Sequence, residues 1–242
     1  FGTLMTIIQS LRLVIFAGLL PTITYSQVCD EQIVFNDSNR NGIFDKQEKG
    51  IGNVAVSNGN HIVYSDNKGR FKLIPDVGQS LFVIKPAGYT LPLRSDGLPD
   101  FFSNQASQDT HLKYGGVKKS DNACRSFALW QSKYNSGKKN KLDVLVFGDP
   151  QPKNLKDVSY YQNDIVKPII GNHKVALGIS LGDIVHDDLS LLPEIKRIDR
   201  ALNTPWLYAA GNHDVDFDAV NDEGSLESFR EQFGPDTYAW EE

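Results

Sequence analysis

The sequence has few cysteines, no long apolar run and no extended basic cluster, and each shortage excludes a class of protein. Its two cysteines, Cys29 and Cys124, are too few for a cysteine-rich zinc module or a disulfide-dense mini-protein. Its 25 lysines and arginines face 30 acidic residues, which gives a net charge of -5, so nucleic acid is not expected as the main partner. A hydrophobic share of 40% is enough for a packed core and excludes disorder as the overall state.

Residues 1–26 have the pattern of a secretory signal peptide, with residues 1–4 as upstream sequence. After Met5 comes a single charge, Arg12, then the apolar stretch Leu13–Leu20, and small residues lead to an expected cleavage after Ser26. Eight apolar residues fall far short of the roughly 20 that span a bilayer, so no transmembrane anchor is expected. We therefore expect a secreted or periplasmic protein.

Export would place the two cysteines in an oxidising compartment. A disulfide between Cys29 and Cys124 is then chemically possible. Two free buried thiols are an equally open alternative, because the sequence does not show whether their Cα atoms approach each other.

Short β-rich runs fill residues 27–131. Turns that contain glycine, asparagine or proline separate these runs, and no 3.6-residue periodicity lies between them. The runs are Ile33–Phe35, Val54–Val56, Ile62–Tyr64, Phe71–Ile74, Leu81–Ile84 and Phe127–Trp130. The pattern predicts a small antiparallel β-sandwich of the immunoglobulin-like or prealbumin-like kind.

The pattern changes after residues 132–141, a polar and basic stretch typical of a linker. From residue 142 to residue 242, apolar strands alternate with helices. Strands are expected at 142–147, 175–181 and 206–210, and helices at 155–167, 190–202 and 223–233. Because these strands are apolar throughout, they indicate a parallel sheet that is covered on both faces.

Residues 37–48 (DSNRNGIFDKQE) match the calcium-loop pattern D-x-[DN]-x-[DN]-G-x5-E at every specified position. The expected oxygen donors are the side chains of Asp37, Asn39, Asn41, Asp45 and Glu48 and the carbonyl of Ile43. The alternative is an Asn/Asp-rich turn that binds nothing, because the helices that flank an EF-hand are missing. Residues 34–89 also resemble the calcium-binding B-type β-sandwich repeats of secreted adhesins, which implies one structural calcium ion.

Polar residues follow each expected strand of the second half. The first strand leads into Asp149-Pro150-Gln151, the second into Gly182-Asp183, and the third into Gly211-Asn212-His213-Asp214. Each cluster alone is typical of a plain turn. Because the carboxyl ends of parallel strands form one ligand crevice, the three together predict a metal site.

These clusters resemble the calcineurin-like metallophosphoesterase signature D-x-H, G-D, G-N-H-D, over about residues 142–242. The preceding sandwich, and D-P-Q in place of D-x-H, resemble a secreted bacterial subgroup of that family. The resemblance implies the βαβαβ half of a four-layer α/β/β/α sandwich. It also implies hydrolysis of a phosphomonoester or phosphodiester, either a small molecule or an exposed phosphate group.

The resemblance further implies two divalent metal ions that share a hydroxide. Asp149 and Gln151 would bind one ion, Asp183 would bridge both, and Asn212 would bind the second. The family usually has an imidazole where Gln151 offers a neutral amide oxygen. This difference favours manganese or magnesium over zinc or iron, or weakens the site.

His213 would face the substrate, with Asp214 orienting its ring. His186 follows Asp183 by three residues, and it either contacts the substrate or lies on a solvent-facing rim. The family's later ligands, a histidine and a G-H-x-H pair, have no counterpart before residue 242. We therefore expect the front half of a catalytic domain whose full-length form is a phosphoesterase. The alternative is an inactive fragment or a calcium-stabilised surface module.

Overall fold

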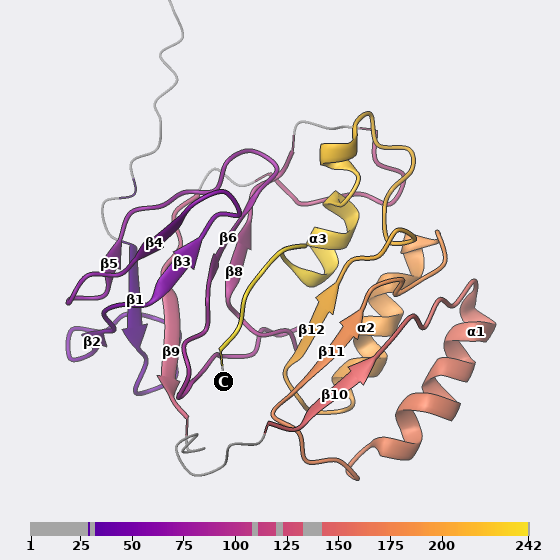
Figure 1. The fold of residues 1–242 in the computed structure, drawn as a ribbon, viewed down its shortest axis with the longest axis horizontal. Helices are drawn as coiled ribbons and strands as arrows, with labels where there is room; N and C mark the ends of the chain where they lie inside the picture. The colour runs from indigo at the N-terminus through magenta and orange to yellow at the C-terminus, as the bar shows by residue number, and fades with distance from the viewer. Residues whose placement is uncertain (1–28, 30–31, 108–110, 120–122, 133–141, 242) are drawn as a thin grey trace, which may run out of the picture.

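The structure is a computed structural model that describes Cys29 and residues 32–107, 111–119, 123–132 and 142–241 (Figure 1). The expected signal peptide lies outside the described residues, so export stays a prediction. The expected linker also lies outside them except for Ser132. In the part of the chain that the structure describes, no helix has the length and apolarity needed to cross a bilayer.

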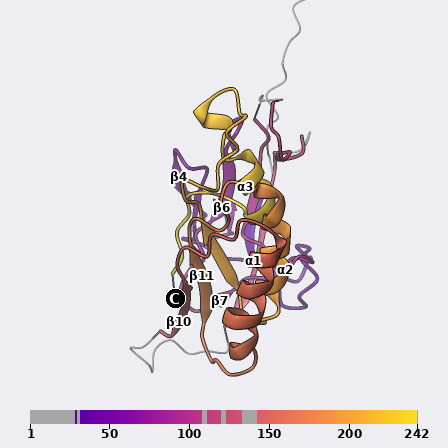
Figure 2. The ribbon, with the colours of Figure 1, turned by 90° about the vertical axis from the view of Figure 1, so that its right-hand side faces the viewer.

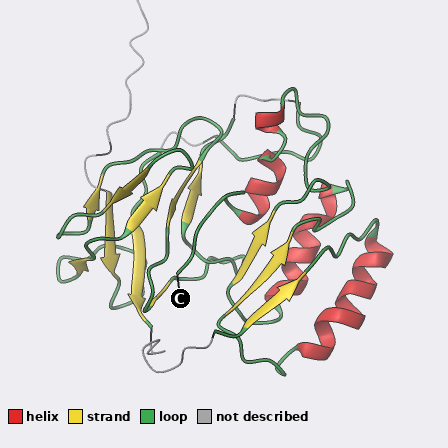
Figure 3. Ribbon diagram, in the orientation of Figure 1, coloured by secondary structure: helices red, strands yellow, loops and turns green. Residues whose placement is uncertain are grey.

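The N-terminal part consists of two β-sheets with a shared core (Figure 3). Its strands are β1 (Gln32–Asn36), β2 (Lys49–Gly50), β3 (Ala55–Ser57), β4 (Ile62–Tyr64), β5 (Arg70–Phe71), β6 (Ser80–Val83), β7 (Tyr89–Thr90), β8 (Phe102–Asn104) and β9 (Phe127–Gln131). One sheet has the order β2-β1-β9-β7, with β5 paired to β1, and the other has the order β4-β3-β6-β8. Val34 and Phe127 from the first sheet meet Val56 and Leu81 from the second in the core. The immunoglobulin-like or prealbumin-like type stays a prediction.

One strand pair departs from the predicted antiparallel arrangement. Strands β1 and β9 run parallel, with Val34 opposite Phe127, whereas the other pairs of these two sheets are antiparallel. A disulfide joins Cys29 and Cys124, whose Cα atoms lie 5.5 Å apart. Each cysteine lies three residues before the start of its strand, so both strands begin at the same end. The long chain between them supplies the crossover that a parallel pair needs.

The second half contains a three-stranded parallel sheet in the order β10-β11-β12. Its elements are β10 (Val144–Phe147), α1 (Leu155–Tyr160), η2 (Tyr161–Val166), η3 (Lys167–Ile169), β11 (Leu177–Leu181), η4 (Leu189–Leu191), α2 (Leu192–Arg200), β12 (Trp206–Ala209), η5 (Asp222–Gly224) and α3 (Glu227–Phe233). The side chain of Asn154 caps α1 by accepting the N–H groups of Lys156 and Asp157. The expected helix 155–167 thus begins as an α-helix, continues as the π-helix η2 and ends as the 3-10 helix η3.

Helices cover one face of this sheet (Figure 2). Trp206 and Tyr208 point to that face and are buried in the helical core. On the opposite face, Leu207 joins the core of the two N-terminal sheets. Val144 and Val146 on β10 are 36% and 48% exposed. The prediction of a sheet covered on both faces is therefore wrong at β10, because this outer strand lies beyond the N-terminal core.

Buried polar contacts join the two halves at α3. Glu227 and Arg230 form an ion pair and are 2% and 3% exposed. The Glu227 carboxylate accepts the N–H groups of Ser107 at 2.8 Å and Val117 at 3.2 Å, and Arg230 donates to the carbonyl of Gly78. The N-terminal part thus supplies the hydrogen bonds that a buried ion pair requires.

Candidate functional site

The loops that follow β10 and β11 meet at Asp183. The backbone N–H of Gln151 donates to the Asp183 carbonyl at 3.0 Å, and Gln151 Nε2 donates to Asp183 Oδ2 at 2.9 Å. The loop that follows β12 joins them, because the N–H of His213 donates to Asp183 Oδ1 at 3.1 Å. Residues from three strand ends therefore surround one half-buried carboxylate. Asp149 and Asn212 lie on exposed parts of the same loops.

Strained backbone is concentrated at this edge of the sheet. Asp149, Gln151, Asp183 and Asp187 have φ angles of 53°, 40°, 48° and 63°. Non-glycine residues rarely adopt this left-handed conformation, which costs about 1–3 kcal/mol at each position. Strain of this kind clusters at functional sites, so its location supports the candidate site.

Gly211 leaves the space that the Asp183 carboxylate occupies. A Cβ atom at position 211 would lie 2.1 Å from Asp183 Oδ1 and 2.3 Å from the Asp183 backbone nitrogen. A residue larger than glycine therefore requires the carboxylate or the loop to move.

His213 is paired with Asp187, a residue outside the strand-end motifs described above. His213 Nδ1 lies 2.7 Å from Asp187 Oδ1. Because a carboxylate only accepts hydrogen bonds, Nδ1 carries the proton. The hydrogen bond raises the pKa of His213 and lowers the pKa of Asp187. The His213 ring also stacks on the ring of His186, with centroids 4.5 Å apart.

The predicted role of Asp214 as the residue that orients His213 is therefore wrong. The carboxylate of Asp214 is fully buried and accepts the N–H groups of Gly211 at 2.8 Å, Ile184 at 3.1 Å and Val185 at 3.2 Å. Asp214 joins the loop after β11 to the loop after β12. Its burial raises its pKa, and the three N–H bonds oppose that shift.

His186 is half-buried next to this pair. In the described part of the chain, His186, Asp187 and His213 are the group of three histidine or carboxylate side chains whose possible ligand atoms lie within 4.8 Å of one another. The sequence offered a signal for Asp187, because it directly follows His186 in the segment that begins with Gly182-Asp183.

The predicted calcium loop lies between β1 and β2, and its oxygen-bearing side chains contact one another. Asn39 and Asn41 each donate from Nδ2 to Asp45 Oδ2, at 2.6 and 2.9 Å. Asp37 is fully buried, and its carboxylate accepts backbone N–H groups of the loop, as does the carboxylate of Glu48. The Ile43 side chain is exposed. Calcium binding stays a prediction.

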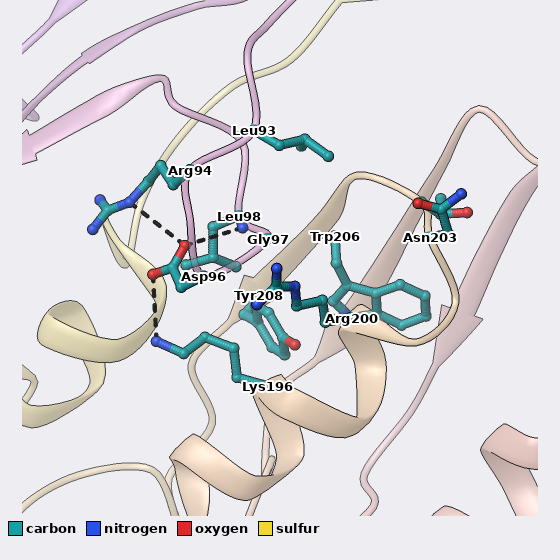
Figure 4. A pocket seen from close by; sticks show the side chains of 11 residues that line it. Leu93, Arg94, Asp96, Gly97, Leu98, Lys196, Arg200, Asn203, Trp206 and Tyr208 are labelled. Carbon is teal, nitrogen blue, oxygen red and sulfur yellow. Dashed lines mark hydrogen bonds and ion pairs between the residues drawn. The ribbon is translucent and has the colours of Figure 1, made fainter.

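A cavity of about 190 Å³ lies between residues 93–98 and α2 (Figure 4). Arg94, Lys196 and Arg200 line it together with Asp96, which pairs with Lys196 at 3.5 Å and with Arg94 at 3.6 Å. The cavity borders the start of β12, whereas His213 follows the carboxyl end of that strand. The cavity is therefore distinct from the candidate site.

A comparison with known families bears on this site. Residues 38–117 match the family model described as N terminal of Calcineurin-like phosphoesterase. The match supports the calcineurin-like phosphoesterase family. It covers about a third of the chain and lies in the N-terminal part, so it is independent of the strand-end residues that carry the resemblance. No curated protein and no solved structure matches the chain.

Proposed function

We propose that the protein is a metal-dependent phosphoesterase whose site lies at the carboxyl ends of β10, β11 and β12. One observation carries the proposal: Asp183 contacts the Gln151 side chain and the His213 backbone, which come from two other loops. The family match over residues 38–117 supports the same class from a separate segment.

The side chains at this edge fit divalent ions that prefer oxygen. Asp149, Gln151, Asp183 and Asn212 offer carboxylate and amide oxygens, a set that favours Mn²⁺ or Mg²⁺ over Zn²⁺ or Fe²⁺. The space next to Gly211 accommodates the Asp183 carboxylate, which we assign to both ions. When bound, such ions would neutralise charge on the phosphoryl oxygens and activate water.

We assign His213 to the leaving oxygen of the substrate. Asp187 keeps the proton on Nδ1, so Nε2 is the atom that faces the reaction. The raised pKa of His213 increases the share of imidazolium at neutral pH. An imidazolium can donate a proton as the bond between phosphorus and the leaving oxygen breaks. Because His213 is in close contact with Asp187, we assign this pair to the substrate. The carboxylate and amide oxygens listed above are assigned to the metal ions.

Calorimetric titration with Mn²⁺ and with Zn²⁺ tests the metal assignment. We expect Asp183→Asn to weaken Mn²⁺ binding at least tenfold, because it removes a charge assigned to both ions. His213→Ala should leave Mn²⁺ affinity within about twofold while it lowers Mn²⁺-dependent hydrolysis of p-nitrophenyl phosphate. Asp164→Asn, at an exposed position of η2, is the matched control. Equal Mn²⁺ affinity of the wild type and Asp183→Asn would refute the ligand set.

A second candidate function is a calcium-stabilised binding module without catalysis. The contacts of Asn39 and Asn41 with Asp45 favour it, since they bring predicted calcium ligands together. This candidate predicts that Ca²⁺ raises the melting temperature. It also predicts that Mn²⁺ titration shows no site sensitive to Asp183→Asn. The Mn²⁺ titration therefore discriminates between the candidates.

A further inference from the structure

The N-terminal part reaches the candidate site through residues 111–117. Tyr114 lies in this segment, and its hydroxyl donates to the backbone carbonyl of Asp187 at 3.2 Å. Asp187 is the residue whose carboxylate holds His213, and its backbone is left-handed, with a φ of 63°. The hydroxyl therefore restrains a residue that is both strained and engaged with the proposed catalytic imidazole.

The same tyrosine is also attached to the loop that carries His213. The Tyr114 N–H donates to Asp216 Oδ2 at 3.1 Å, and Asp216 follows His213 by three residues. Asp216 is 1% exposed. A buried carboxylate is costly to leave without donors, so this contact is expected to persist.

Helix α3 fixes the segment from its other side. The Ser228 hydroxyl lies within hydrogen-bond distance of the Gly115 carbonyl and of Asp216 Oδ2. The Val117 N–H donates to Glu227, which is itself buried. The neighbours of Tyr114 are thus hydrogen-bonded to α3, while its hydroxyl extends to Asp187.

We propose that Tyr114 is a positioning residue, whose hydroxyl holds Asp187 where it fixes the Nδ1–H tautomer of His213. On this view the candidate site is completed by the N-terminal part. The proposal rests on the proposed function, which assigns His213 to the substrate. A tyrosine with a purely structural role would affect stability in the same way, but it would leave the ratio of the two His213 tautomers unchanged.

The test uses ¹⁵N NMR of the histidine rings at one alkaline pH, where the imidazoles are neutral. The ratio of Nδ1–H to Nε2–H tautomer of His213 is compared between the wild type and Tyr114→Phe, which removes only the hydroxyl. Tyr64→Phe is the matched control, because Tyr64 is 64% exposed. His173 is an internal reference, since its Nδ1 lies 2.8 Å from the Ile169 carbonyl in a separate contact.

We expect Tyr114→Phe to lower the His213 ratio at least twofold, with no change in Tyr64→Phe or at His173. Asp187→Asn is the positive control and should lower the ratio roughly tenfold, because it removes a charge-assisted hydrogen bond. Ser228→Ala is a second variant that loosens Tyr114 from α3 and should shift the ratio in the same direction.

The outcomes separate the role of Tyr114 from the pairing of His213 with Asp187. A wild-type ratio in Tyr114→Phe, with a lowered ratio in Asp187→Asn, would overturn the role of Tyr114 and keep that of Asp187. A wild-type ratio in Asp187→Asn would overturn the pairing of His213 with Asp187, on which the proposed function depends. An equal shift at His173 in Tyr114→Phe would identify a general structural effect and also overturn the proposal.

Discussion

Asp199 on α2 is fully buried, and its position predicts a pH-dependent stability. Its carboxylate accepts the hydroxyl of Tyr161 at 2.5 Å and that of Tyr208 at 2.9 Å. Burial raises the pKa of Asp199 to about 7, although the two hydroxyl bonds oppose the shift. In the unfolded chain an aspartate has a pKa of about 3.9. Between roughly pH 4 and pH 7, the folded protein therefore holds a proton that the unfolded chain has released.

The free energy of unfolding should fall as the pH rises through this window, because the unfolded state binds fewer protons than the folded state. One group contributes a slope of about 1.4 kcal/mol per pH unit. Over the three units between the two pKa values, the contribution of Asp199 amounts to about 4 kcal/mol. Below pH 4 and above pH 7 this contribution is constant.

Asp199→Asn removes this titration and retains a side chain of the same shape. Relative to the wild type, the variant's free energy of unfolding should rise by about 4 kcal/mol between pH 4 and pH 7.5. The free energy of unfolding is measured by urea unfolding with the disulfide intact. The fluorescence of Trp206, which is buried in the same core, reports the transition. Asp164→Asn, at an exposed position, should follow the wild-type pH dependence. If the free energy of unfolding had the same pH dependence in the wild type and in Asp199→Asn, the reasoning would be refuted.

Three further predictions concern the disulfide, the calcium loop and the glycine next to the candidate metal site. Because Cys29 and Cys124 are 95 residues apart, Cys124→Ser should lower the free energy of unfolding by about 4 kcal/mol, and reductant should lower the melting temperature of the wild type alone. Calcium should raise the melting temperature of the wild type and not of Asp37→Ala; equal melting of the wild type in calcium and in chelator would contradict the site. Gly211→Ala should weaken Mn²⁺ binding at least tenfold, because the methyl group would take the space of the Asp183 carboxylate; wild-type affinity would show that the loop relaxes freely.

The sequence predicted the strands better than their pairing. Apolar runs such as Leu81–Ile84 mark strands because their pattern is local. The parallel pairing of β1 with β9 depends on segments almost a hundred residues apart, and no local signal reports it. The exposure of Val144 was not predictable for a similar reason. An apolar strand has the same sequence pattern at the centre and at the edge of a sheet.

The candidate site was predictable where it follows strand ends. The contacts among Gln151, Asp183 and His213 arise from parallel strands whose loops open at one edge, which is a general property of such sheets. The choice between Asp187 and Asp214 as the partner of His213 depends on which carboxylate is buried against backbone N–H groups, and spacing does not determine that. Tyr114 was not predictable at all, because it approaches from the other half of the chain.

The buried ion pair on α3 has a consequence for how this chain could be divided or recombined. A cut at residues 132–141, where the sequence shows its clearest boundary, would separate Glu227 and Arg230 from their three backbone partners. Each lost partner of a buried polar group costs about 1–3 kcal/mol, and more when the group is charged. The halves should therefore behave as one cooperative unit, so that either expressed alone would be prone to aggregation. In evolution, exchange of the N-terminal part by recombination would require a replacement that brings matching backbone groups to α3.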